Sequence, residues 1–237
     1  MTDPRQLAVA FVTAVHAAAG ERLEAAAMFG SAARGEWIEG VSDVNVLVLL
    51  DDIDAPLLAR LAPVARAALP RGVRPLVMER GEWRRAEDVF SIELADMKDA
   101  HSPLFGDDPT TGLMPQPAAL RIQAESELRS KLLHLHAGMM MVEDEARLGQ
   151  LFVHALPSFV TYLRAALRLA QQTVPQNMRD VITAGCTLAG TTPDAFLSVL
   201  EARRSGAPFT VTLTDAVADN FNSSAERIAA FVDAFGR

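Results

Sequence analysis

The hydrophobic pattern changes type near residue 110, and this change restricts the possible folds more than any other feature. Before that point, short runs rich in β-branched residues alternate with segments of helical periodicity. Beyond it, the periodicity is helical throughout. The sequence therefore predicts an α+β (α/β) architecture, in which a small mixed sheet with flanking helices is followed by an antiparallel helical bundle.

The first half contains one strand that is clearer than the others. Val44–Leu50 reads VNVLVLL, a run of strand length dominated by β-branched and other apolar residues. Phe90–Asp96 alternates apolar and polar residues, which also predicts a strand. The remaining predicted elements are helices over 6–19 and 55–69 and strands over 25–29 and 73–79.

The segment Gly106–Pro117 has three prolines, two glycines and two aspartates, a composition typical of a linker. We therefore predict two domains, 1–110 and 111–237. The expected helices of the second domain cover 118–141, 147–171, 175–188, 193–203 and 215–234.

Charge and composition exclude several classes of protein. The net charge is −8, and residues 1–110 carry 11 Lys and Arg against 18 Asp and Glu, a net of −7. This acidity argues against a nucleic acid partner held by a broad basic face. A single cysteine excludes an internal disulfide framework, and no apolar run reaches the length of a membrane span. The start makes a poor signal peptide, so we expect a cytoplasmic protein.

One segment carries a pattern suited to phosphate and metal chemistry. Phe29-Gly30-Ser31 ends a predicted strand, and the turn is expected to open a helix whose N-terminal N–H groups would suit a phosphate. After eleven intervening residues, Asp43 and Asn45 lie two apart at the start of the next strand, so both side chains project to one face. Two oxygen ligands beside a phosphate cradle suit Mg²⁺.

This segment resembles the nucleotidyltransferase superfamily, which includes DNA polymerase beta and kanamycin nucleotidyltransferase. The signature is a hydrophobic residue, Gly, then Gly or Ser, a spacer, and Asp-hydrophobic-Asp/Glu-hydrophobic. Here Phe29-Gly30-Ser31 and Asp43-Val44-Asn45-Val46 match it, except at Asn45. The motif GSAARGE…SDVNVLV covers about 20 residues. The order of the two domains, sheet and then helical bundle, extends the resemblance loosely over the whole chain.

The resemblance implies a two-metal transfer of a nucleoside monophosphate from an NTP to a hydroxyl of a small molecule or protein. Gly30 and Ser31 would bind the phosphates, and Arg34 would steer the triphosphate. Asp43 and Asn45 would hold Mg²⁺ with a third carboxylate on a neighbouring strand, for which we choose Glu93. The competitor is Asp96, which falls on the opposite face of an uninterrupted strand over 90–96. A homodimer is compatible with the sequence.

The departure from the family pattern is Asn45, where the family has a carboxylate. An amide offers one oxygen to a metal but brings no charge. Losing that charge weakens the electrostatic clamp on two divalent ions. The alternative to an active enzyme is therefore a catalytically silent nucleotidyltransferase fold that binds a nucleotide or a partner and regulates.

Overall fold

The computed structural model describes residues 2–235 and divides the chain into two compact units, Met1–Pro115 and Gln116–Arg237. The division falls within the predicted linker of 106–117. The first unit is built on a four-stranded sheet in the order β3-β2-β1-β4. Its strands are β1 (Leu23–Phe29), β2 (Val44–Leu50), β3 (Val73–Glu79) and β4 (His101–Gly106).

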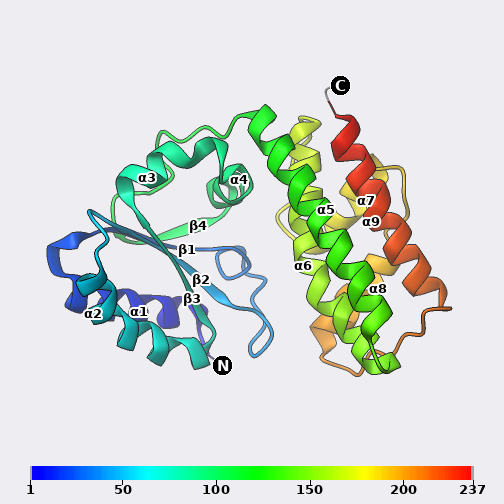
Figure 1. Ribbon diagram of the computed structural model, residues 1–237, viewed down its shortest axis with the longest axis horizontal. Coiled ribbons are helices and arrows are strands. Elements are labelled where there is room, and N and C mark those ends of the chain that lie inside the picture. The colour runs from blue at the N-terminus through cyan, green and yellow to red at the C-terminus, as the bar shows by residue number, and fades with distance from the viewer. Residues whose placement is uncertain (1, 236–237) are drawn as a thin grey trace. The chain divides into compact units, whose positions relative to one another are not determined.

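The sheet is mixed. β2 and β3 are parallel and are joined by the helix α2, whereas β1 is antiparallel to both β2 and β4. Helices α1 (Pro4–Ala19) and α2 (Ala55–Ala68) cover one face, and α3 (Arg80–Arg85) and α4 (Ser91–Asp99) cover the other (Figure 1). Short 3₁₀ turns connect these elements at Gly20–Arg22, Leu69–Arg71 and Ala86–Asp88.

The strand β2 supplies residues to both hydrophobic cores of this unit. Val46 and Val48 pack with α1 and α2, while Leu47 and Leu49 pack with the side of α3 and α4. This division follows from the alternation of side chains along a strand. Asp43 and Asn45 have the same parity as Leu47, so they continue the row on the α3 and α4 side.

The prediction of a strand over 90–96 is wrong, because this segment forms most of the helix α4. Phe90, Leu94 and Met97 are spaced i, i+4 and i+7 and pack against one core, which is the spacing of a helix face. Residues 90–96 alternate between apolar and polar, and this window stops before Met97, so the helical spacing was not recognised. Glu93 was chosen because of its face on a predicted strand, and since this segment is a helix, that reason no longer holds.

The fourth strand of the sheet is β4, which was not predicted. It reads HSPLFG, and its proline and terminal glycine do not resemble a central strand. As an edge strand it pairs only with β1, so Pro103 is compatible with its position. The sequence HSPLFG has no strand periodicity of its own, and the segment is extended because it pairs with β1.

The second unit consists of helices, as predicted, and the five expected helices are confirmed to within three residues at each end. Its core is aromatic: Phe152 and Phe159 of α6, Phe196 of α8 and Phe221 of α9 pack with ring centroids 4.5 to 5.8 Å apart. The helices are α5 (Pro117–Met141), α6 (Glu145–Leu169), α7 (Met178–Leu188), α8 (Asp194–Ser205) and α9 (Ala216–Ala234).

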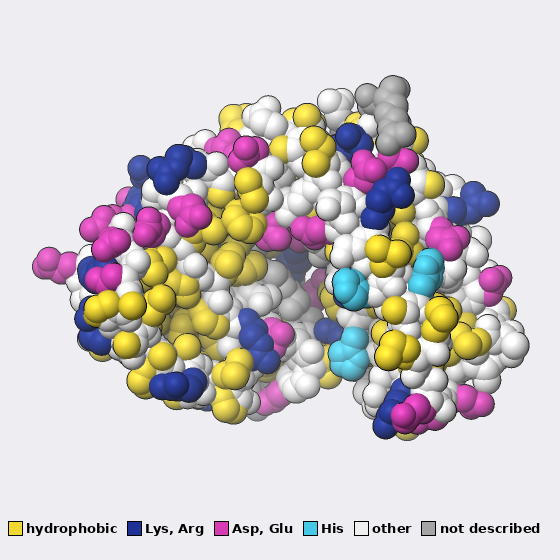
Figure 2. Space-filling model, in the orientation of Figure 1, with side chains coloured by type: hydrophobic (Ala, Val, Ile, Leu, Met, Phe, Trp, Pro, Cys, Tyr) yellow, Lys and Arg dark blue, Asp and Glu magenta, His cyan; other side chains and the backbone are white. Residues whose placement is uncertain are grey.

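Charges of both signs are mixed on one face of the molecule (Figure 2). On the face drawn in Figure 2, dark blue Lys and Arg side chains alternate with magenta Asp and Glu, and its described residues form no broad basic patch. Among residues 2–235, no helix is long and apolar enough to cross a membrane.

Candidate functional site

The Gly30 turn follows β1 directly and is a single turn, not the start of a helix as predicted. Its first bond runs from the Arg34 amide to the Gly30 carbonyl, at 3.1 Å. The Glu36 amide then donates to the Ser31 carbonyl at 2.9 Å, and Gly35 has a φ of +73°. A left-handed glycine with this bond is the arrangement of a Schellman motif, so Gly35 prevents the turn from continuing as a helix. A single turn adds little helix dipole for a phosphate.

Gly30 lies against Asn45. The Cα atoms of Phe29 and Asn45 are paired between β1 and β2, so the turn starts beside the Asn45 side chain. Gly30 has a φ of +76°, and a Cβ atom there would lie 3.1 Å from the Asn45 Nδ2 atom. Both the backbone conformation and the space therefore favour glycine at this position. The structure thus brings together Gly30 and Asn45, two of the predicted site residues.

A basic residue, Arg74, occupies the neighbouring strand at this position. Its Cα atom is paired with that of Asn45 across the parallel strands β2 and β3. Its Nη2 atom lies 3.4 Å from Asp43 Oδ1, while its Nη1 atom donates to the Leu69 carbonyl oxygen at 3.1 Å. The Asp43 and Arg74 side chains are 50% and 44% exposed. The carboxylate of the motif thus faces a guanidinium.

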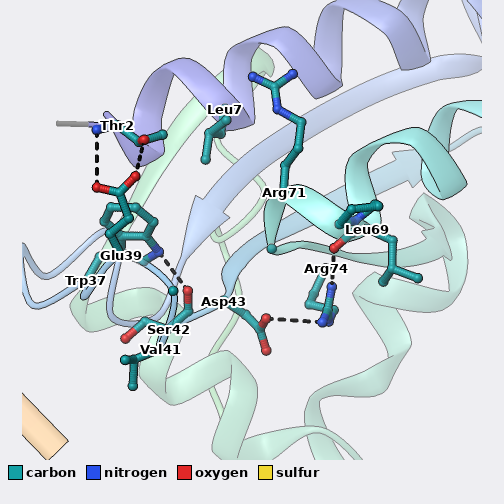
Figure 3. Close-up of a pocket in the computed structure, with 13 residues that line it drawn as sticks. Thr2, Leu7, Trp37, Glu39, Val41, Ser42, Asp43, Leu69, Arg71 and Arg74 are labelled. Atoms are coloured by element: carbon teal, nitrogen blue, oxygen red, sulfur yellow. Dashed lines mark hydrogen bonds and ion pairs between the residues drawn. The ribbon is translucent and has the colours of Figure 1, made fainter. Parts of the chain in front are cut away.

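Asp43 and Arg74 both line a cavity of about 490 Å³ at the amino ends of β2 and β3 (Figure 3). The loop that precedes Asp43 is closed by a hydrogen bond from Trp37 Nε1 to the Ser42 carbonyl, at 2.8 Å. On the far wall, Thr2 donates to the carboxylate of Glu39, and these hydrogen bonds hold the pKa of Glu39 below its ordinary value. The Trp37 side chain therefore packs the loop.

Arg34 lies in a different environment from the one its predicted role requires. Its side chain is only 2% exposed, and its Nη2 atom donates to the Asp96 carbonyl oxygen at 3.1 Å. The same atom lies 3.7 Å from the Asp96 carboxylate. This pair joins the Gly30 turn to α4 inside the protein. Steering of a triphosphate by Arg34 stays a prediction, and it would require the side chain to leave Asp96.

The third carboxylate is the least supported member of the predicted metal site. Glu93 is half-buried on the helix α4, not on a strand beside β2, and Asp96 is engaged with Arg34. Among residues 2–235, no three His, Cys, Asp or Glu side chains are grouped so that they could hold a metal ion. The predicted ligands at the start of β2 are one carboxylate, Asp43, and one amide, Asn45. Such a set does not fit two Mg²⁺ ions.

The role of Arg74 was missed at the sequence level. The signal was an arginine at the second position of a strand, VRPLVME, whose next four residues are apolar. Its meaning depends on the register between β2 and β3, because only the register places Arg74 beside Asn45.

Comparison with solved structures gives a match over both units. The fold is similar to that of spectinomycin adenyltransferase AAD(9) from Enterococcus faecialis, crystallised with ATP and spectinomycin. The TM-score is 0.59 at 14% sequence identity, and the match covers 94% of this chain and 98% of the other. No protein family and no curated protein matches the sequence. The chain therefore has a nucleotidyltransferase-like fold with a helical second unit.

Proposed function

We propose that this protein binds a nucleoside triphosphate beside Gly30 and Ser31 but does not transfer its nucleotidyl group. One observation carries the proposal: Arg74 is in register with Asn45 and forms an ion pair with Asp43, 3.4 Å away. The family pattern implies a third carboxylate on a neighbouring strand, whereas here β3 presents a cation beside Asn45 and Asp43.

The electrostatic consequence is large for a divalent ion. Two unit charges at 4 Å interact by about 1 kcal/mol in water and about 4 kcal/mol at the dielectric near a protein surface. The repulsion doubles for Mg²⁺ facing a guanidinium. Asn45 contributes no compensating charge, and the charge of Asp43 is opposed by the guanidinium of Arg74. Because two-metal transfer depends on bound divalent ions, the combination of Asp43, Asn45 and Arg74 disfavours this reaction.

Binding of a nucleotide is supported by features that do not require a metal. Gly30 retains its close backbone position beside Asn45, and Ser31 follows it in the turn. The solved structure with a similar fold is of an enzyme crystallised with ATP. ATP is therefore the first nucleotide to test, and the protein would act as a nucleotide-binding regulatory or interaction protein.

The second candidate is a Mg²⁺-dependent nucleotidyltransferase that modifies a hydroxyl of a small molecule or protein. It is favoured by the extent of the structural match, which includes the helical unit as well as the sheet. Asp43 also remains half-exposed and could bind one Mg²⁺ ion if Arg74 moved away. In this candidate, Asp43 and Glu93 would be the catalytic carboxylates.

Calorimetry and a transfer assay separate the two candidates. Each NTP is titrated into the native chain and into Asn45→Asp, and pyrophosphate release is followed with Mg²⁺, ATP and spectinomycin. We expect ATP to bind the native chain without release of pyrophosphate above the protein-free rate. Sustained release by the native chain, abolished in Asp43→Asn, would establish the second candidate. If no NTP binds either protein, both candidates are wrong.

A further inference from the structure

The guanidinium of Arg74 is fixed at the site by the backbone. Its Nη1 atom donates to the carbonyl oxygen of Leu69, the residue that opens the 3₁₀ turn before β3. The side chain is therefore held on the rim of the cavity rather than lying freely on the surface. Figure 3 shows it pointing toward Asp43, while the nearby Arg71 points away from that pair.

The ion pair between Arg74 and Asp43 leaves the guanidinium able to bind an anion. The separation of 3.4 Å is longer than that of a well-formed charge-assisted hydrogen bond, and both side chains are about half-exposed. A pair of this kind contributes little to stability and is easily exchanged for another partner. A guanidinium has five N–H donors in a planar fork that matches two oxygens of a phosphate.

The surroundings provide both a space and a connection to the Gly30 turn. Arg74 and Asp43 line the cavity of about 490 Å³, and Arg74 is also in register with Asn45, which lies beside Gly30. The other acidic residue of the cavity, Glu39, is hydrogen-bonded to Thr2 on the opposite wall. Arg74 thus presents its guanidinium beside Asp43 and Asn45, the residues from which a Mg²⁺ site was predicted.

We infer that Arg74 takes the place of the divalent cation, so that the protein binds the phosphates of a nucleoside triphosphate in their metal-free form. This inference rests on the proposed nucleotide binding and specifies the ionic form of the ligand. Asp43 then has the opposite role to that of a metal ligand: it competes with the phosphates for Arg74 instead of holding Mg²⁺.

The two roles of Asp43 predict changes of opposite sign in Asp43→Asn. If Asp43 competes for Arg74, removing its charge tightens ATP binding in EDTA by roughly three- to tenfold. If Asp43 instead holds Mg²⁺, the same variant loses ATP binding in MgCl₂. The matched control is Asp51→Asn, an exposed aspartate just beyond the opposite end of β2, which is expected to bind ATP as the native chain does.

Arg74→Ala tests the same inference from the other partner. We expect it to weaken ATP binding in EDTA by roughly tenfold to a hundredfold, the effect of losing a hydrogen bond to a charged group. Arg66→Ala removes an exposed arginine from α2 and is expected to leave binding unchanged. Circular dichroism melting curves verify that each variant is folded.

The experiment is an isothermal titration of ATP into each protein, once in EDTA and once in excess MgCl₂. The inference predicts that the native chain binds ATP in EDTA at least as tightly as with Mg²⁺. It is overturned if binding requires Mg²⁺, if Asp43→Asn loses binding, or if Arg74→Ala binds as the native chain does. Binding in neither buffer would instead show that the proposed nucleotide binding is wrong, and this inference with it.

Discussion

Two arginine–aspartate pairs lie at the same edge of the first unit, and they differ mainly in exposure. The pair of Arg34 and Asp96 is buried, with side chains 2% and 18% exposed. The pair of Arg74 and Asp43 is about half-exposed and lines a cavity. The first joins a turn to the helix α4, whereas the second faces solvent and can exchange partners. Burial, rather than residue type, separates the structural pair from the candidate binding pair.

The largest expected effect comes from breaking the buried pair. Asp96→Ala leaves the Arg34 guanidinium buried without its carboxylate, which typically costs about 3–5 kcal/mol. We expect the free energy of unfolding, measured by urea denaturation, to fall by about 3 kcal/mol. A loss below about 1 kcal/mol would place this pair in the same class as the exposed one.

A smaller effect is expected at Gly30, whose turn contains Arg34 and which lies beside Asn45, the register partner of Arg74. Gly30→Ala forces a non-glycine residue to a φ of +76° and places its Cβ atom 3.1 Å from Asn45 Nδ2. Such strain costs about 1–3 kcal/mol. The control is Gly40→Ala, where φ is also +76° but the Cβ atom meets no other described atom within 4 Å. We expect Gly30→Ala to be the less stable variant in urea denaturation, and equal stability would contradict the close packing against Asn45.

The exposed pair is expected to matter little for stability. Half-exposed ion pairs contribute about 0–1 kcal/mol, so Arg74→Ala is expected to change the free energy of unfolding by less than about 1 kcal/mol. The same urea titration measures it. If the loss approached that of Asp96→Ala, Arg74 would be a structural residue, and its proposed exchange between Asp43 and a phosphate would be untenable.

The smallest effect concerns Asp108, a carboxylate held mostly by hydrogen bonds. Burial raises the pKa of Asp108. Hydrogen bonds from the amide and hydroxyl of Thr110, together with the interaction with His101, lower it by more, so the net pKa is below the ordinary value. The folded pKa is thus below the unfolded one, so this stabilisation is present above about pH 4 and is lost as the pH falls through the folded value.

Asp108→Asn is therefore expected to reduce the difference in stability between pH 6 and pH 3, by a few tenths of a kcal/mol because the side chain is well exposed. Urea denaturation at the two pH values measures it. The exposed Asp51, changed to Asn, is the control, and an equal reduction in both variants would contradict the role given to Asp108.

The sequence predicted the regular elements well because their signal is local. The strands Val44–Leu50 and Val73–Glu79 have the expected bounds, and the five helices of the second unit were found from their periodicity. The pattern failed over 90–96, where a short window alternates although the longer segment has helical spacing. β4 was missed because its order comes from pairing with β1.

The candidate site was only partly predictable, for a related reason. Gly30, Asp43 and Asn45 are close in sequence, and the structure brings Gly30 and Asn45 together. The partners that decide their chemistry are distant: Arg74 reaches Asp43 through the strand register, and Asp96 lies 62 residues beyond Arg34. Neither pairing follows from local pattern, because each depends on how the sheet and α4 are assembled.

Arg74 is proposed to stand where a nucleotidyltransferase would hold a divalent cation. Titration of Mn²⁺ followed by electron paramagnetic resonance tests it directly, since bound Mn²⁺ loses the signal of the free ion. We predict no bound Mn²⁺ at sub-millimolar concentrations in the native chain, and measurable binding in the double variant Asn45→Asp/Arg74→Glu, which places carboxylates at both register positions. Binding of Mn²⁺ by the native chain as tight as in the double variant would contradict the claim.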